Sequence, residues 1–420
     1  MRFFIGCFFA PFLFLTTAFG DEFVPAEPSS IGIDPERLQH VDRAIRRAIE
    51  NDEVPGAVAI IARKGKIGYH KSFGHANLEA GEVLKNDAIF RIASMTKAIT
   101  SVAVMQLYEA GHFRLGDPVS KFIPEFKDPK VLVKTEEDGK TLTRPAKREI
   151  TIRDLLTHTA GIGYTFIPSS VQEIYREADI VDGVTHKPYV LKDVIPRLGG
   201  LPLIHDPGEK WTYGLNTDVL GYLVEVVSGK PLDEYFQEHL FAPLGMVDTG
   251  FYLPEEKANR LVTWYRATKD GLKPQVGAGN EFGAEPDYPV NGARSYFSGG
   301  GGLSGTALDY ARFIQMLLNE GELDGQRVLS RKSVELMRAV QVEDFGGEAF
   351  GFGLGFRVLA DAGKRGELGS AGTYSWGGAF FTSYWIDPSE QLIAVLMCQV
   401  RPAFSQLGEQ FQTAVYQALE

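Results

Sequence analysis

Ser94 and Lys97 are the two residues of this sequence whose types and spacing most clearly suggest chemistry. They stand three positions apart, and on a helix this spacing places both side chains on one face, about one turn apart. The lysine amine could then take the proton of the serine hydroxyl. A serine needs such a base to act as a nucleophile, and a lysine serves as one when burial or a neighbouring cation lowers its pKa. At a helix N-terminus, free backbone N–H groups would also stabilise developing negative charge.

The Ser-x-x-Lys spacing is a weak indication when it is taken alone. About two chance matches are expected in a chain of this length and average composition, and the sequence contains one. A serine at a helix N-terminus followed by a solvated lysine would be the simpler interpretation. The surrounding residues therefore have to decide between the two.

Those surrounding residues resemble the serine β-lactamase and penicillin-binding-protein superfamily. Several segments match the family pattern in its order and spacing, over roughly residues 54–400, which is most of the chain. The resemblance implies that Ser94 is the nucleophile and that Lys97 is its proton-transfer partner. The matching segments are Phe90 to Lys97, Ile152 to Gly161, Trp211 to Tyr213, Gly299 to Leu303 and Asp309 to Phe313.

The resemblance also assigns proton transfer to Tyr213. In the family a Tyr-x-Asn motif holds the tyrosine near the nucleophile, whereas this sequence reads Tyr213-Gly214-Leu215-Asn216. Leu215 stands where the asparagine is expected, so Asn216, one place later, is a candidate substitute in substrate binding. The alternative for Tyr213 is a buried structural tyrosine that follows Trp211.

The third family motif, Lys-Thr-Gly or a close variant, is replaced here by Trp376-Gly377-Gly378-Ala379. In the family that lysine helps hold a substrate carboxylate, so Trp376 leaves an apolar, aromatic wall in place of a charge contact. Trp-Gly-Gly resembles the β-lactamase-like carboxylesterases of family VIII. The glycines would let the strand backbone approach the substrate, and the N–H groups of Ala379 and Ser94 would form an oxyanion hole. Alternatively, the glycine pair only permits a bulge.

Other chemistries find less support in the sequence. His158 lies in a short apolar helix pattern where the family has no catalytic histidine, which favours a structural role. No His or carboxylate spacing indicates a metal, no cofactor is implied, and no Gly-x-Ser-x-Gly elbow is present. The Gly299 to Gly302 run lacks the setting of a phosphate loop and is interpreted as a flexible loop.

Residues 1–20 are predicted to be a secretory signal. Arg2 is followed by an apolar run, and Ala18-Phe19-Gly20 forms a small-x-small cleavage site. We therefore expect a secreted or periplasmic mature chain, 21–420, without a stable membrane anchor. Without Arg2, that chain holds 42 basic against 54 acidic residues, a net charge of −12, which argues against nucleic-acid binding. Its single cysteine, Cys398, rules out an internal disulfide.

The periodicity of apolar residues predicts an α+β fold. Strand patterns lie near both ends of the chain, and helices lie between them. This order favours an antiparallel sheet built from N- and C-terminal segments (about 30–115 and 321–420), flanked by helices, with a mostly helical and loop-rich insertion at about 116–320. Helices are predicted at 38–50, 94–110, 152–158, 219–227, 331–340 and 404–419, and strands at 57–62, 67–73, 350–359, 378–387 and 391–400.

These features predict a carboxylesterase with a small-molecule ester substrate. A β-lactamase or D-peptide hydrolase that uses the same residues is the alternative, with a β-lactam or cell-wall peptide as substrate. A binding or scaffold protein without turnover is a third hypothesis, which a complete Ser94, Lys97 and Tyr213 set makes less favoured. The sequence leaves open the acyl preference and the oligomeric state.

Overall fold

Strand β1 (Gly56–Arg63) joins the two ends of the chain into one sheet. In the computed structural model, which describes residues 23–136, 139–278, 285–343 and 345–420, every residue of β1 is buried. Val58 and Ile60 pack into one hydrophobic core, while Ala59 and Ile61 pack into a second core on the opposite face. A strand covered on both faces explains the unbroken apolar run in the sequence. The predicted signal segment, 1–20, lies outside the described residues.

The sheet has eight strands in the order β12-β13-β14-β15-β16-β1-β2-β3, and all neighbouring strands are antiparallel. Because β1 pairs with β2 on one side and with β16 on the other, the N-terminal hairpin continues directly into the C-terminal strands. The predicted antiparallel α+β fold is confirmed. The strands are β1 (Gly56–Arg63), β2 (Lys66–Asn77), β3 (Glu82–Val83), β12 (Phe350–Phe352), β13 (Arg357–Leu359), β14 (Tyr374–Gly378), β15 (Thr382–Asp387) and β16 (Leu392–Met397).

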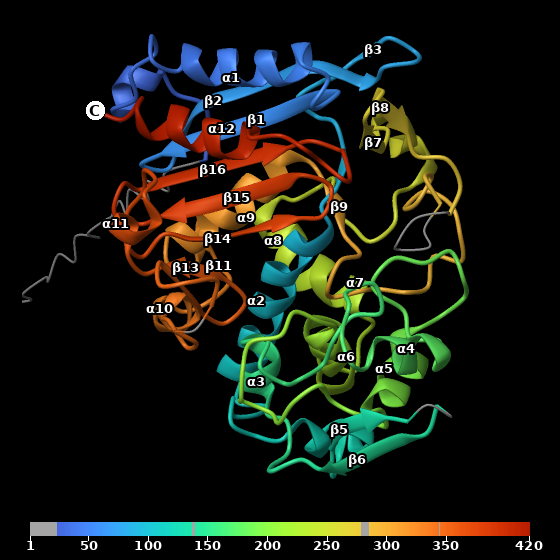
Figure 1. Cartoon of the computed structure of the whole chain (residues 1–420). Helices are drawn as coiled ribbons and strands as arrows, with labels where there is room; N and C mark the ends of the chain where they lie inside the picture. Colours follow the sequence, from blue (N-terminus) through green and yellow to red (C-terminus); the bar gives the residue numbers. More distant parts are fainter. Residues whose placement is uncertain (1–22, 137–138, 279–284, 344) are drawn as a thin grey trace, which may run out of the picture.

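Helices cover both faces of the sheet (Figure 1). On one face α1 (Gln39–Glu50) packs against α12 (Leu407–Tyr416), and on the other α9 (Ala307–Leu318) packs against β1, β15 and β16. The sequence assigned α9 to the insertion, but its apolar face belongs to the sheet's core. Helix α2 (Thr96–Glu109) packs against α6 (Asn216–Ser228), is buried over most of its length and directly follows the turn that carries the candidate nucleophile.

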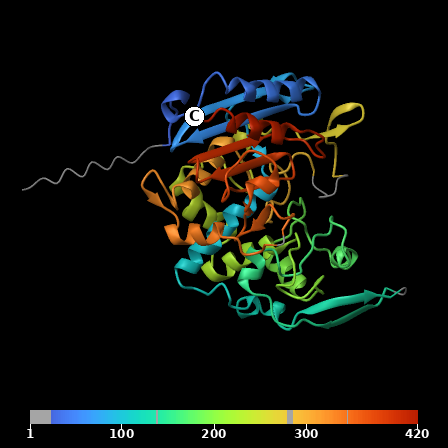
Figure 2. The same ribbon diagram turned by 60° about the vertical axis from the view of Figure 1, so that its left-hand side comes forward.

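The remaining helices form a region beside the sheet, centred on α6, which packs against α2, α3, α5 and α7. Figure 2 shows the hairpin β5–β6 projecting from this region. Its helices are α3 (Ile152–Leu156), α4 (Gln172–Glu177), α5 (Leu191–Gly199), α6 (Asn216–Ser228), α7 (Leu232–Phe236) and α8 (Ala242–Leu244). The helices of the C-terminal part are α10 (Arg331–Arg338) and α11 (Ala362–Arg365). The short strands are β4 (Phe90–Arg91), β5 (Lys130–Thr135), β6 (Thr141–Pro145), β7 (Tyr265–Thr268), β8 (Gly271–Pro274), β9 (Ser304–Gly305), β10 (Glu322–Leu323) and β11 (Gln326–Arg327).

Two predicted strands are wrong in their extent. The stretch 350–359 is the hairpin β12–β13, because the chain reverses at Gly355, which has a φ of 94°. The stretch 378–387 contains the end of β14, a tight turn and β15, and Phe381 in that turn has a φ of 64°. Ala379 therefore lies just after β14 and not on it. Apolar patterning continues through both turns, so it could not reveal them.

The described part of the chain contains no helix long and apolar enough to cross a membrane. Within the same residues Cys398 is a free thiol, fully buried at the end of β16, as expected for a single cysteine.

Candidate active site

Ser94 lies in a single 3-10 turn, Ala93–Met95, between strand β4 and helix α2. The turn is held in place because the hydroxyl of Tyr310 donates to the Met95 carbonyl at 2.9 Å. Ala93 has a φ of 42°, a strained conformation for a residue with a side chain, and such strain is concentrated at functional sites. Ser94 thus lies at the N-terminal end of a buried helix, as the sequence predicts.

Lys97 lies one turn further along the same face and is almost completely buried. Its Nζ is 3.3 Å from Ser94 Oγ and donates to the Gly300 carbonyl at 2.5 Å. Lys97 Nζ also lies 4.8 Å from the ring centre of Tyr213 and 5.6 Å from that of Tyr164. The predicted juxtaposition of the serine and the lysine is therefore present, and Tyr164 is a neighbour that no sequence motif indicated.

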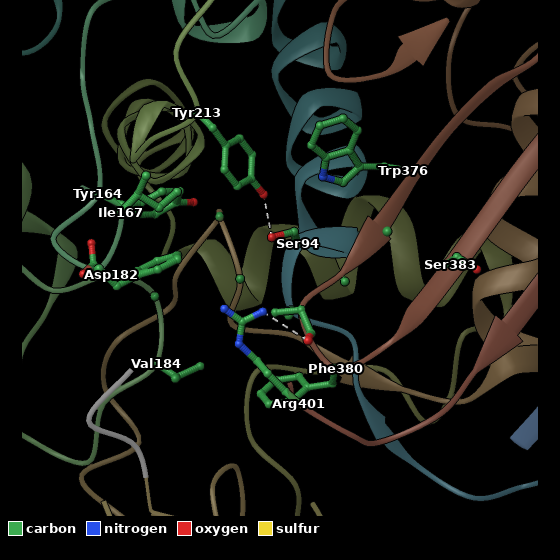
Figure 3. A pocket seen from close by; sticks show the side chains of 18 of the residues that line it. Ser94, Tyr164, Ile167, Asp182, Val184, Tyr213, Trp376, Phe380, Ser383 and Arg401 are labelled. Atoms are coloured by element: carbon green, nitrogen blue, oxygen red, sulfur yellow. Dashed lines mark hydrogen bonds between the residues drawn. The ribbon is translucent and has the colours of Figure 1, made fainter. Parts of the chain in front are cut away.

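Tyr213 completes the group, since its hydroxyl donates to Ser94 Oγ at 2.6 Å (Figure 3). The ring is held within an aromatic cluster. It stacks on Trp211 with ring centres 5.7 Å apart and planes 9° apart, and it lies 5.7 Å from Trp376 and 5.2 Å from His158. Tyr213 reaches Ser94 from the loop before α6. The family resemblance predicted this proximity, although the two residues are distant in the sequence.

His158 and Asn216 lie behind Tyr213 and not in the cavity wall. Both are buried, and Asn216 Nδ2 is 2.9 Å from His158 Nδ1. Burial, together with the charge of Lys97, holds the pKa of His158 well below its usual value, so the imidazole stays neutral. The predicted structural role of His158 agrees with this position. Asn216, expected as a substitute for the family's substrate-binding asparagine, instead contacts His158 and supports the cluster behind Tyr213.

The Gly299 to Gly302 run, which the sequence predicts to be a flexible loop, is largely buried. It packs tightly between α2 and α6, where Gly300 N–H donates to Asp218 Oδ1 at 3.3 Å, while the Gly300 carbonyl receives Lys97. A side chain at Gly300 would overlap the Asp218 carboxylate. Burial raises the pKa of Asp218, and the charge of Lys97 opposes that rise. The glycines permit this close approach of the backbone to Asp218 and Lys97. A run of glycines in the sequence does not distinguish such tight packing from a flexible loop.

The Trp376 to Ala379 segment lies directly beside the nucleophile turn. A Cβ at Gly378 would overlap the Ile92 carbonyl oxygen and Thr382 Oγ1, so only glycine allows this approach. Within the described chain, the backbone N–H groups of Ser94 and Ala379 donate to no protein acceptor. Two adjacent free amides beside a serine hydroxyl can stabilise an oxyanion. Trp376 contributes the aromatic wall that the sequence predicts.

These residues open onto a cavity of about 690 Å³. Its walls are mainly aromatic or aliphatic, and Figure 3 shows the guanidinium of Arg401 on the side of Ser94 away from Tyr213. Arg401 donates to the Ala379 carbonyl at 3.4 Å. Asp182 also contributes to the wall, and burial raises its pKa to about 6. Neither Asp182 nor Arg401 could be predicted from the sequence, because neither lies in a motif. The lining includes Ser94, Tyr164, Phe166, Ile167, Val184, Tyr213, Trp376, Gly377, Gly378, Ala379 and Phe380.

The site is thus a serine hydroxyl in hydrogen-bond contact with an amine and a phenol, beside two free backbone amides. This combination suits nucleophilic attack on a carbonyl group. Across the described residues, no group of three or more His, Cys, Asp or Glu side chains is arranged to hold a metal ion.

Comparison with known proteins identifies relatives over most of the chain. The Beta-lactamase family model matches residues 41–415. Protein Rv1367c of Mycobacterium tuberculosis is 37% identical over 379 residues, covering 86% of this chain and 90% of that protein. Esterase EstB of Burkholderia gladioli is 32% identical over 383 residues, covering 88% and 93%. Among solved structures, EstCE1, described as a hydrolase with promiscuous acyltransferase activity, superposes with a TM-score of 0.79 at 29% identity, covering 91% of this chain and 99% of its own.

Proposed function

The chain belongs to the β-lactamase family and is a serine hydrolase, and we propose that it cleaves carboxylic esters through an acyl-enzyme on Ser94. The observation that carries this proposal is the contact of Ser94 Oγ with both Tyr213 Oη and Lys97 Nζ, at 2.6 and 3.3 Å. Both partners can exchange protons, and neither contact would be needed if the serine were only structural. The name of Esterase EstB supports the choice of an ester as substrate.

In the first half of the reaction, Ser94 Oγ attacks the ester carbonyl carbon. Lys97 in its neutral amine form, together with Tyr213, takes the serine proton, and the carbonyl oxygen becomes an oxyanion that accepts hydrogen bonds from the N–H groups of Ser94 and Ala379. When the tetrahedral intermediate collapses, the C–O bond to the alcohol breaks. The proton returns to the departing alcohol, which leaves the acyl group bound to Ser94.

In the second half, water attacks the acyl carbonyl while the same pair of side chains removes its proton. The bond between Ser94 Oγ and the acyl carbon breaks, the serine regains a proton, and the carboxylic acid leaves. Burial of Lys97 supports this role, because little water reaches its amine while the Ser94 hydroxyl lies within hydrogen-bond distance of it.

The walls of the cavity support an ester over a β-lactam. Trp376 occupies the position of the family lysine that would contact a substrate carboxylate, and it packs 5.7 Å from the Tyr213 ring and 5.5 Å from Phe352. An apolar wall of this kind favours the aliphatic or aromatic groups of a neutral ester through burial of apolar surface.

β-Lactam hydrolysis is the second candidate, and Arg401 is the observation that favours it. This cation lines the same cavity and contacts the Ala379 carbonyl. A guanidinium can bind a carboxylate in a bidentate manner. Arg401 would then supply the positive charge that is missing because Trp376 stands in place of the family lysine.

We further propose that residues 1–20 direct the chain out of the cytoplasm and are removed, which would give a secreted or periplasmic enzyme. Mass spectrometry of the chain purified from outside the cytoplasm should show an N-terminus near Asp21. An N-terminus that retains Met1 would overturn this proposal.

The ester proposal is tested by measuring turnover of p-nitrophenyl butyrate and nitrocefin side by side, with Ser94→Ala as the blank. Ester cleavage that depends on Ser94, with little nitrocefin turnover, supports the carboxylesterase. The reverse preference would make β-lactam hydrolysis the function and would assign the carboxylate contact to Arg401.

A further inference from the structure

A second cavity adjoins the catalytic one and shares part of its wall. It has a volume of about 680 Å³ and lies between the β13–β15 strands and helices α11 and α12. Arg357, Trp376 and Ser383 line both cavities. The two spaces therefore share a wall around β14, and Arg357 belongs to the lining of the catalytic cavity itself.

The pairing of the strands explains where the two cavities meet. Strand β13 pairs with β14 only through Arg357 with Ser375 and Val358 with Tyr374. Beyond Ser375, residues 376–378 of β14 pair with β15 alone, so their other edge is free over the described residues. This free edge runs from the turn next to Ser94 to Arg357, which is the first residue of β13.

Arg357 and Ser383 share one face of the sheet. Residues directly paired across antiparallel strands point to the same side, and the pairs are Arg357 with Ser375, Ser375 with Trp385, and Gly377 with Ser383. Trp385 packs on α12 through Phe411, so this face is the one toward α12. Because Gly377 has no side chain, this face stays uncovered between Arg357 and the catalytic cavity.

No described carboxylate forms an ion pair with Arg357, and Glu367 acts on its charge only from beyond ion-pair distance. Its Nε and Nη2 donate to Ser375 Oγ at 3.2 and 3.1 Å, while Nη1 donates to no described residue. The neighbouring cations are paired, Lys364 with Glu348 and Arg365 with Glu367. Burial, followed by repulsion from Arg365, lowers the pKa of Arg357, and the charge of Glu367 opposes this only in part, so a bound anion would add stabilisation to the charged form.

We propose that Arg357 forms an anion subsite that binds a carboxylate at the far end of the substrate's acyl chain. The leaving alcohol must lie against Tyr213 and Lys97, which return its proton, so the acyl chain is left to follow the free edge of β14. A guanidinium with an open nitrogen, at the end of that edge, binds a carboxylate by charge-assisted hydrogen bonds. The substrate class is thus monoesters of dicarboxylic acids. This inference rests on the proposed ester hydrolysis at Ser94.

The test compares kcat/KM for mono-p-nitrophenyl adipate and suberate with that for the neutral p-nitrophenyl hexanoate and octanoate of equal chain length. We expect Arg357→Gln to lower the ratio of anionic to neutral ester at least tenfold, through KM. Arg357→Lys should restore part of the ratio, because the charge returns. Arg37→Gln, the same charge change at an exposed residue paired with Asp34, should keep the parent's ratio. The neutral ester corrects for any loss of folded protein.

A ratio that stays within twofold of the parent's in Arg357→Gln would overturn the anion subsite. Calorimetric titration of the Ser94→Ala chain with suberate separates this result from failure of the proposed function. Suberate binding that Arg357→Gln abolishes supports the subsite even if no ester is turned over, in which case only the ester proposal fails. Absence of suberate binding to Ser94→Ala would overturn the subsite.

Discussion

Tyr213 Oη lies 2.6 Å from Ser94 Oγ, closer than Lys97 Nζ at 3.3 Å. The phenol is thus the nearer of the two proposed proton-transfer partners. Its ring is fixed by Trp211 on one side and by His158 and Trp376 around it. Such packing holds the hydroxyl in place before substrate arrives, and this preorganisation is what a positioned acid or base requires.

Replacing Ser94 by Ala removes the attacking oxygen. We expect ester turnover to fall by about 10⁴-fold or more, because loss of a covalent nucleophile leaves only binding and oxyanion stabilisation. The thermal midpoint should change little, since among the described residues Ser94 Oγ forms hydrogen bonds only with Lys97 and Tyr213. Release of p-nitrophenol by the purified variant measures the first effect, and calorimetry measures the second. Full retention of turnover would exclude Ser94 as the nucleophile.

Replacing Tyr213 by Phe removes the hydroxyl but keeps the ring in its cluster. We expect kcat to fall by about 10²- to 10⁴-fold with a small change in KM, as for loss of a general acid–base group. Tyr164→Phe is the matched control. Its ring lies 5.3 Å from that of Tyr213, but no hydrogen bond to Ser94 is lost. Equal losses in both variants would argue that the ring packing, and not the Tyr213 hydroxyl, supports turnover.

Gly378→Ala and Gly377→Ala form a matched pair on β14. The added methyl at 378 would overlap the Ile92 carbonyl and Thr382, whereas at 377 its nearest neighbour is the Thr382 carbonyl oxygen at 3.1 Å. We expect Gly378→Ala to lower kcat about a hundredfold, because the Ala379 amide is displaced from the oxyanion position. Gly377→Ala should lower kcat less than tenfold. Steady-state kinetics on p-nitrophenyl butyrate decide between them, and equal effects would contradict the oxyanion role of Ala379.

Trp376→Lys restores the cation of the family motif. We expect kcat/KM for p-nitrophenyl butyrate to fall at least tenfold, because the aromatic contacts to Tyr213 and Phe352 are lost. The ratio of nitrocefin to ester turnover should rise, since the new ammonium can meet the β-lactam carboxylate. Trp376→Phe serves as the control that keeps an aromatic wall. An unchanged ratio in Trp376→Lys would show that Trp376 does not govern this selectivity.

Glu225 predicts a pH dependence of stability. Burial raises the pKa of Glu225 from 4.5 to about 7, while Leu232 N–H donates to its Oε1 at 3.0 Å. The folded chain keeps this proton up to about pH 7, whereas the unfolded chain loses it near pH 4.5. The group's contribution therefore falls as pH rises from 4.5 to 7.

The neutral isostere Glu225→Gln should remove that loss. We expect it to raise the free energy of unfolding by about 1 to 3 kcal/mol at pH 8 and to leave it nearly unchanged at pH 4. Urea denaturation at the two pH values measures the difference. The exposed Glu234→Gln on α7 is the control, with no expected change at either pH. A Glu225→Gln variant no more stable than the parent at pH 8 would contradict the buried, protonated state.

Several parts of the architecture could be predicted because they depend on local patterns. The apolar run of β1 indicated a buried strand, and the strand patterns at both chain ends indicated one antiparallel sheet, which the structure and the structural relatives confirm. The family was predicted from motif order and is confirmed by the match over residues 41–415. Strand limits at Gly355 and Phe381 were missed, because a turn inside an apolar stretch leaves the hydrophobic pattern unbroken.

The sequence by itself predicted the groups of the site: a serine and a lysine three positions apart, with their roles, a tyrosine and a Trp-Gly-Gly segment assigned by resemblance. Only the tertiary structure decided what surrounds them. The cavity wall includes three residues from segments far from any motif: Asp182, Arg357 and Arg401. Asn216, in contrast, contacts His158 and does not line the cavity. The physical reason is that a motif consists of residues whose relative positions are fixed within one helix, strand or turn. The walls of a cavity are instead set by the packing of many elements against one another.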